Sequence, residues 1–154
     1  MIPREAILEM VQFIVLTLHG APANIDKLPE VVAVSPSEMA RTICVSVPQE
    51  QMQGCTNRAA AISAAYVRKD NKVYYNAFIL HPETGVLGKS YIIHELTHWY
   101  QDVDFGTLTC LQIKEKELEA YRVQDTYLAS FDANFMPGKF AAKFGEKFVC
   151  HDKN

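Results

Sequence analysis

Residues 90–101 constrain the fold more than any other part of the chain, and they read Ser-Tyr-Ile-Ile-His-Glu-Leu-Thr-His-Trp-Tyr-Gln. From Tyr91 on, the segment has no Gly, no Pro and no charged residue except Glu95, so nothing interrupts a helix. Residues four apart on a helix share a face, which predicts that His94 and His98 stand one turn apart. Two imidazoles placed in this way can bind one zinc ion, and Glu95, about 100° round the helix, can reach a water on the open side of that ion. The alternative is a pair of helix histidines with ordinary hydrogen-bond partners and a solvated glutamate.

A catalytic zinc site has three protein ligands and one open position, which directs attention to residues 111–131. This segment has helical periodicity, and Glu115, Glu117 and Glu119 compete as the third ligand. At about 100° per residue, Glu117 falls on the apolar stripe, whereas Glu115 and Glu119 fall about 160° away from it. We therefore expect Glu117 to point inward and the other two to face water. A buried carboxylate is costly unless it is paired, so Glu117 holds either a metal ion or a basic partner such as Arg or Lys.

These residues resemble the gluzincins, zinc metallopeptidases that take two histidine ligands from one helix and a glutamate ligand from a following helix. Residues 94–98 (His-Glu-Leu-Thr-His) are similar to the zinc-binding segment of the thermolysin-like members, and residues 117–121 (Glu-Leu-Glu-Ala-Tyr) are similar to the second segment. Eighteen residues separate His98 from Glu117, close to the spacing in the compact, single-domain members called minigluzincins. One departure is Tyr121, because the family usually has an aspartate there that orients a zinc-bound histidine.

The resemblance implies that His94, His98 and Glu117 hold Zn²⁺ and that the protein hydrolyses a peptide or protein substrate. Glu95 is then the general base, which takes a proton from the attacking water and returns it to the leaving amine. The expected function is therefore that of a zinc metallopeptidase. No substrate preference follows from the spacing of these residues.

The oxyanion that develops during such a reaction needs a donor besides zinc, and in this family the donor is a Tyr or His outside the motif. Tyr121 and His151 are the candidates here. Two alternatives to an active enzyme stay open. One is a zinc-binding domain without catalysis that acts in partner binding, and the other is a latent enzyme in which a segment of the chain blocks the metal.

The expected fold is α+β and zincin-like: one domain over residues 1–154, mostly helical, with a small antiparallel β-hairpin or sheet packed on the two zinc-binding helices. By the resemblance, residues 73–80 could pair with an extended substrate, although a hairpin that only covers the helices is the alternative. The elements predicted from periodicity and turn residues are helices at 3–19, 39–45 and 140–148, strands at 30–34, 59–67 and 72–80, and a loop at 48–57.

Composition excludes several other classes of function. The 154 residues carry a formal net charge of −3, and Lys and Arg form no cluster with interleaved aromatics, which argues against nucleic acid as a partner. No apolar run approaches the roughly 20 residues of a membrane span.

The final helix is expected to begin around Pro137-Gly138-Lys139.

The chain has four cysteines, at positions 44, 55, 110 and 150, and none belongs to a Cys-x-x-Cys pair. Their even number and wide spacing fit two disulfides, with Cys44–Cys55 and Cys110–Cys150 favoured among three possible pairings because these cysteines are neighbours in order. Disulfides indicate a periplasmic or secreted protein. Four buried free thiols in a cytoplasmic protein are the alternative.

Overall fold

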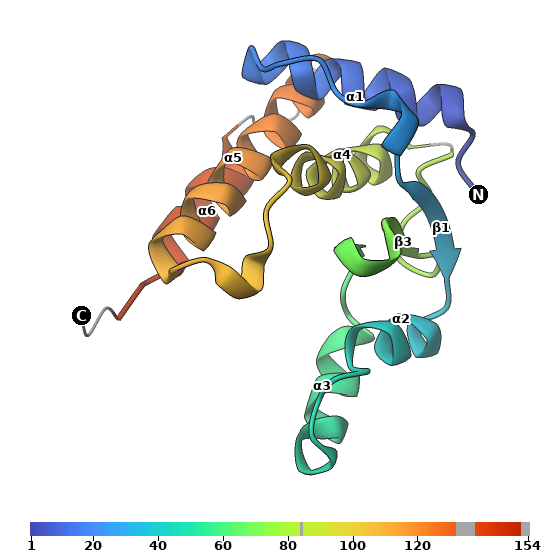
Figure 1. Ribbon diagram of the computed structural model, residues 1–154, viewed down its shortest axis with the longest axis vertical. Helices are drawn as coiled ribbons and strands as arrows, with labels where there is room; N and C mark the ends of the chain where they lie inside the picture. Colours follow the sequence, from blue (N-terminus) through green and yellow to red (C-terminus); the bar gives the residue numbers. More distant parts are fainter. Residues whose placement is uncertain (84, 132–137, 152–154) are drawn as a thin grey trace.

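The computed structural model describes residues 1–83, 85–131 and 138–151, and within them the chain is α+β (Figure 1). The predicted helices at 3–19, 90–101, 111–131 and 140–148 are confirmed, with ends that differ by up to four residues. The elements in chain order are α1 (Arg4–Leu18), β1 (Glu30–Val34), α2 (Pro36–Ile43), α3 (Met52–Ala59), β2 (Ala64–Val67), β3 (Lys72–Asn76), α4 (Val86–Gln101), α5 (Cys110–Ala129) and α6 (Lys139–Lys147).

The three strands form one mixed sheet in the order β1-β3-β2. Strand β3 is central, because Val73 lies opposite Val31 in a parallel pairing with β1 and opposite Tyr66 in an antiparallel pairing with β2. The predicted antiparallel hairpin is thus only half of the sheet. The possibility implied by the resemblance, that residues 73–80 offer an edge to a substrate, is wrong, since β3 pairs with β1 and β2 and ends at Asn76. Among the described residues, β2 has one edge without a strand partner.

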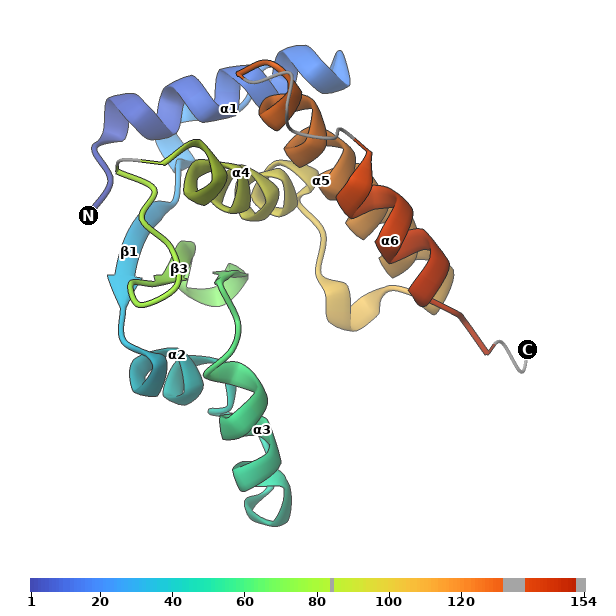
Figure 2. The same cartoon turned by 180° about the vertical axis from the view of Figure 1, so that it is seen from behind.

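Helix α4 lies at the centre of the main core. Ile92, Ile93 and Leu96 on α4 have no exposed surface, and they belong to one cluster with Ile14 of α1 and Val73 of β3. Burying a side chain of this size contributes roughly 1.5–3 kcal/mol. Figure 1 shows α1 above α4 and the sheet below it, and Figure 2, from behind, shows α6 running along α5. The helix with the two histidines is therefore held from several sides.

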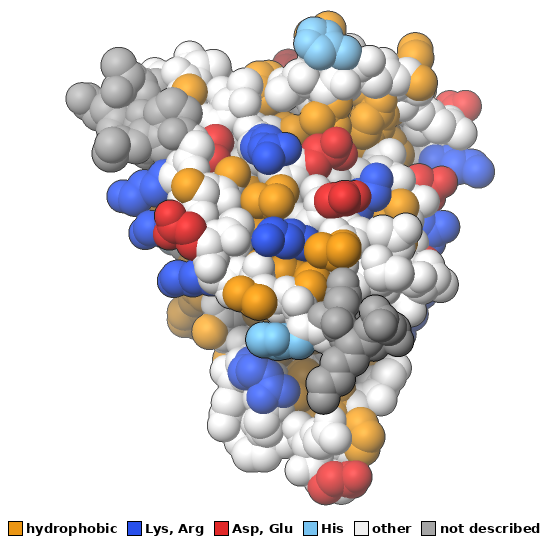
Figure 3. Space-filling view, turned by 90° about the vertical axis from the view of Figure 1, so that its left-hand side faces the viewer, with side chains coloured by type: hydrophobic (Ala, Val, Ile, Leu, Met, Phe, Trp, Pro, Cys, Tyr) orange, Lys and Arg blue, Asp and Glu red, His pale blue; other side chains and the backbone are white. Residues whose placement is uncertain are grey.

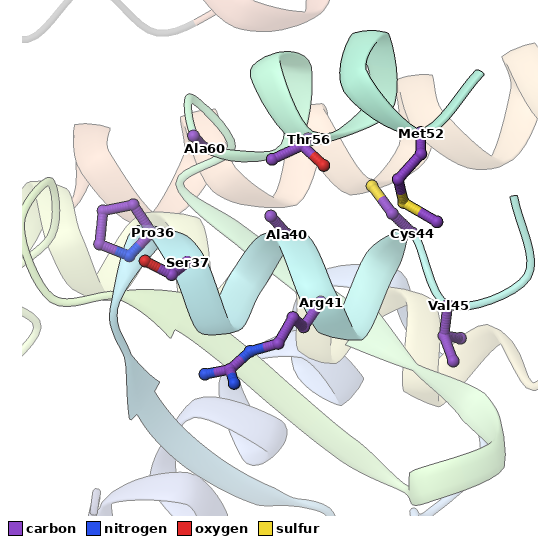
Figure 4. A pocket seen from close by; sticks show the side chains of 9 residues that line it. All are labelled: Pro36, Ser37, Ala40, Arg41, Cys44, Val45, Met52, Thr56 and Ala60. Carbon is purple, nitrogen blue, oxygen red and sulfur yellow. The ribbon is translucent and has the colours of Figure 1, made fainter. Parts of the chain in front are cut away.

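Helices α2 and α3 form a separate small unit with its own apolar cluster, which includes Ala40, Cys44, Cys55 and Ala59. The expected loop at 48–57 is wrong, because a 3-10 turn at 49–51 and α3 occupy this stretch. Only two residues of α3 are buried, Cys55 and Ala59, and they lie one turn apart beside the Cys44–Cys55 disulfide. The crosslink and tertiary packing thus hold a helix whose own sequence, with Gly54, Thr56 and Asn57, does not predict one. A pocket of about 640 Å³ opens between the two helices (Figure 4).

Helix α5 begins with a reciprocal cap. The Thr109 hydroxyl accepts the Gln112 N–H at 3.2 Å and the Gln112 side chain accepts the Thr109 N–H at 2.9 Å. At its far end, Asp125 of α5 accepts the Phe140 N–H at 3.4 Å and the Ala141 N–H at 3.2 Å, so it caps α6. Pro137, expected near the start of the last helix, lies outside the described residues.

Both disulfides favoured from the sequence are confirmed. Cys44–Cys55 joins α2 to α3, and Cys110–Cys150 joins the first residue of α5 to the segment after α6. Two disulfides fit an extracellular or periplasmic location. None of the described helices is long and apolar enough to cross a membrane. On the face shown in Figure 3, Lys and Arg side chains lie among acidic and apolar ones and do not gather into a field of one charge.

Candidate metal centre

The two histidines of α4 lie on one face, as the spacing predicts. Their Nε2 atoms are 3.2 Å apart, and the ring centroids are 4.9 Å apart in an edge-to-face arrangement. Both residues are more than nine-tenths buried. Helix α4 is continuous here because an apolar run supplies its buried face, and it ends only at Asp102, which adopts the left-handed conformation with φ 49°. The helix thus delivers two imidazole nitrogens to one point.

The third donor arrives from α5, the helix with the most extensive packing against α4. Glu117 places Oε1 2.7 Å from His98 Nε2 and Oε2 3.3 Å from His94 Nε2, with 22% of its side chain exposed. Glu117 therefore points inward, as expected, while Glu115 is exposed. The expectation for Glu119 is wrong, because its carboxylate accepts a hydrogen bond from the amide of Gln101 on α4 at 3.0 Å. Packing of the two helices, which single-helix periodicity does not describe, brings Glu119 into this contact.

The spacing of the three donor groups is compatible with one zinc ion. Tetrahedral zinc has nitrogen and oxygen ligands at about 2.0–2.1 Å, so neighbouring ligand atoms stand about 3.3 Å apart. At this site the two histidine Nε2 atoms are 3.2 Å apart, His94 Nε2 is 3.3 Å from Oε2 of Glu117, and His98 Nε2 is 2.7 Å from Oε1 of Glu117. The shortest of the three is the hydrogen bond between His98 and Glu117. Two imidazoles and one carboxylate are also the ligand types that zinc prefers at catalytic sites.

Without a metal, His98 and Glu117 stabilise each other as ions. Burial favours the neutral form of Glu117, but its hydrogen bonds with His94 and His98 outweigh burial and lower its pKa to about 2. Burial likewise disfavours the charged form of His98, yet the hydrogen bond to Glu117 and the charges of Glu95 and Glu117 raise the pKa of His98 to about 9. The centre is thus a buried network in which protons occupy positions that a cation could take.

Glu95 lies beside the centre and is tied to the sheet. Its Oε2 accepts the backbone N–H of Tyr66 on β2 at 2.9 Å, and its Oε1 is 4.0 Å from His94 Nε2. Ligand-type atoms of His94, Glu95 and His98 all lie within 4.8 Å of one another. With 17% of its side chain exposed, Glu95 can contact both the centre and the solvent-filled space beside it.

That space is a cleft of about 580 Å³ along β2. Glu95, His98 and Glu117 line it, so three groups of the centre are reachable from outside, whereas His94 is not among the lining residues. The C-terminal end of α2 and the loop before β2 supply apolar side chains to one part of the wall. These include Ile43, Val45 and Ile62.

The outer nitrogens of the two rings differ. His98 Nδ1 is 2.8 Å from Oε1 of Gln101, whereas His94 Nδ1 is buried and has no hydrogen-bond partner among the described residues. Neither Gln101 nor the backbone of Tyr66 was expected at the site. Gln101 could have been found, because it follows His98 by three residues and therefore shares its helix face. The Tyr66 contact depends on how β2 packs on α4, which leaves no signal in the local sequence.

The two candidates for stabilising an oxyanion lie in different surroundings. The Tyr121 ring packs against His94 with centroids 4.3 Å apart and against Phe144 of α6 at 5.1 Å. Burial, with the nearby charges of Glu117 and Glu95, raises the pKa of Tyr121 to about 12, so it keeps its proton. His151 is exposed next to Cys150, and no hydrogen bond or ring contact of the described residues joins it to the centre.

Comparisons of the chain with protein-family models, with curated proteins and with solved structures gave no match.

Proposed function

We propose that this protein is a zinc-dependent metallopeptidase of the gluzincin type, in which α4, α5 and the β2 edge take a zincin-like arrangement. One observation carries the proposal: the Nε2 atoms of His94 and His98 lie 3.2 Å apart, and each lies within 3.3 Å of a carboxylate oxygen of Glu117, beside a cleft that Glu95 also lines. A structural zinc site has four protein ligands, whereas this centre offers three and an accessible side.

Zn²⁺ bound here would supply an acidified water and a Lewis acid for the substrate carbonyl. The residues of the chain do the rest. Glu95 accepts the proton of the attacking water at its carboxylate and delivers it to the leaving amine. The Tyr66 N–H holds Oε2 of Glu95 by a 2.9 Å hydrogen bond, which leaves Oε1 to carry the proton. Tyr121, protonated and beside His94, is the better placed of the two oxyanion candidates.

The edge of β2 suits a peptide substrate. The Ser63 carbonyl accepts the Asn76 N–H of β3, and backbone groups alternate along a strand, so the backbone groups of Ala64 and Tyr66 point away from β3. The Tyr66 N–H is already bonded to Glu95, which leaves the Ala64 backbone groups and the Tyr66 carbonyl for a peptide. An extended peptide can add to such an edge through main-chain hydrogen bonds. We therefore propose peptides or proteins as substrates, in the periplasm or outside the cell.

The alternative, a latent or non-catalytic zinc-binding domain that acts in partner binding, also has an observation in its favour. Tyr121 covers the His94 ring, and Phe140 and Phe144 of α6 pack on Tyr121. One side of the centre is thereby closed. The two functions differ in whether zinc-loaded protein turns over peptides.

Glu95→Gln tests the enzyme directly. The amide keeps its place beside the Tyr66 N–H but cannot take a proton, so zinc content should stay at one ion per chain while hydrolysis of a fluorogenic peptide mixture falls roughly 100- to 10,000-fold. Glu115→Gln is the matched control, because Glu115 is exposed on α5, and it should leave both quantities unchanged. Hydrolysis that survives in Glu95→Gln would end the peptidase proposal.

A further inference from the structure

Gln101 is the last residue of α4, and its side-chain amide lies between His98 and α5. Its Oε1 is 2.8 Å from His98 Nδ1. Its Nε2 donates to the Lys116 carbonyl at 3.0 Å and to Oε1 of Glu119 at 3.0 Å. One side chain thus connects a histidine of the centre with the helix that carries Glu117.

The groups around this amide determine which side its oxygen faces and which side its NH₂ group faces. A backbone carbonyl and a carboxylate can only accept hydrogen bonds, so the NH₂ group must face Lys116 and Glu119. The amide oxygen must then face His98, and since that oxygen also only accepts, the proton between them belongs to Nδ1 of His98. Nε2 is the nitrogen that faces Glu117.

We propose that Gln101 is a positioning residue, which keeps the ring proton of His98 on Nδ1 while Nε2 binds a metal ion, and which ties this ligand to α5 through Glu119. The metal-binding part rests on the proposed function, whereas the hydrogen-bond part does not. Partners of this kind fix the ring of a metal-bound histidine and the nitrogen it presents. The same position filled by an apolar residue would leave His98 free to rotate and to place its proton on the metal-facing nitrogen.

The first measurement is zinc affinity, from competition with a chelator. Gln101→Leu should weaken zinc binding roughly 10- to 100-fold, the effect of losing an outer partner of a metal-bound histidine. Gln124→Leu is the matched control, because Gln124 is a wholly buried glutamine of α5 whose amide donates to Ser90 at 3.2 Å. The control should stay within about threefold of the unaltered protein. Equal affinities for the two variants would overturn the proposal.

The second measurement uses metal-free protein and separates this inference from the proposed function. By NMR, the Hδ1 proton of His98 should be protected from exchange in the unaltered protein and in Gln124→Leu, and should exchange rapidly in Gln101→Leu. Persistent protection in Gln101→Leu would overturn the role of Gln101, even in a protein that binds zinc. If the unaltered protein binds no zinc while Hδ1 behaves as expected, the metal function fails and the positioning contact stands.

A double variant tests the link to α5. Gln101→Glu with Glu119→Gln reverses the polarity of that contact, so the carboxylate still accepts from His98 Nδ1 and now also accepts from the amide at position 119. Gln101→Glu alone places two carboxylates side by side. The double variant should therefore bind zinc more tightly than Gln101→Glu alone, although the Lys116 carbonyl then lacks its donor. No gain in the double variant would sink the proposed link through Glu119.

Discussion

His94 and His98 occupy equivalent places on one helix, yet their surroundings differ. His98 opens onto the cleft, and its outer nitrogen meets Gln101 at 2.8 Å. His94 lies on the closed side under Tyr121, and its outer nitrogen is buried without a partner among the described residues. A buried polar atom without a hydrogen bond is costly, so the two rings are not equally prepared to hold a cation.

The difference shows that motif spacing places the two imidazole rings but does not orient them. Orientation depends on what each ring meets on its outer side, and here one ring meets an amide and the other meets aromatic side chains. Four predictions, from the largest expected effect to the smallest, test how far the two sides of the centre differ.

The closed side depends on α6, which the Cys110–Cys150 bridge ties to the start of α5. Replacing both cysteines by serine should lower the free energy of unfolding by about 4 kcal/mol, because the bridge closes a 40-residue loop. The same change at Cys44 and Cys55, 11 residues apart, should cost about 3 kcal/mol. Urea unfolding of the two double variants checks both values. A larger loss for the shorter loop would contradict this account.

Removing either histidine ring should weaken zinc binding more than the loss of an outer hydrogen-bond partner does. His94→Ala and His98→Ala should each weaken zinc binding by more than about 100-fold, above the range for outer partners. Exposed His81→Ala is the control and should change nothing. Calorimetric titration with zinc measures the affinity of each variant. If His94→Ala retains tight binding, the closed-side ring is no ligand and the centre is built from His98 and Glu117 alone.

An acceptor supplied to His94 should make the two sides alike. Tyr121→Asp places a carboxylate where the gluzincins usually have one, and it should bind zinc about 10-fold more tightly than Tyr121→Ala. Both variants lose the same ring packing on Phe140 and Phe144, so comparing them isolates the acceptor. Chelator competition gives the two affinities, and equal values would show that the partnerless nitrogen of His94 does not limit binding.

The aromatic contact on the open side of the centre should have the smallest effect on zinc affinity. Phe105 meets His98 edge-on with centroids 4.9 Å apart, but Gln101 already holds that ring. Phe105→Leu should therefore change zinc affinity by less than about threefold, the scale of a fraction of a kcal/mol. Combined with Gln101→Leu, the same change should cost more than it does alone. Strict additivity of the two changes in binding free energy would contradict the idea that Gln101 masks the effect of Phe105 on His98.

The parts of the structure that could be predicted were those with a local physical cause. A segment that neither Gly nor Pro interrupts places His94 and His98 one turn apart, and apolar periodicity turns Glu117 inward. Both features are present in the structure. The two disulfide pairings were also predicted, from the order of the cysteines.

Features that depend on contacts between distant segments could not be predicted. Helix α3 is stabilised by a crosslink to α2, and the place of β3 between two strands depends on the parallel partner β1. The contact of Glu119 with Gln101 arises only when α5 packs on α4. Zinc binding and hydrolysis stay predictions, which the experiments above can decide.

The hydrogen bond from the Tyr66 backbone N–H to Glu95 connects β2, the strand proposed to bind a peptide, with the carboxylate proposed to take the proton of the attacking water. A ligand that straightens or displaces β2 therefore also re-aims the carboxylate. In the proposed peptidase, peptide binding and peptide cleavage would therefore depend on the same contact. A peptide that binds in a shifted register should then bind without being cleaved.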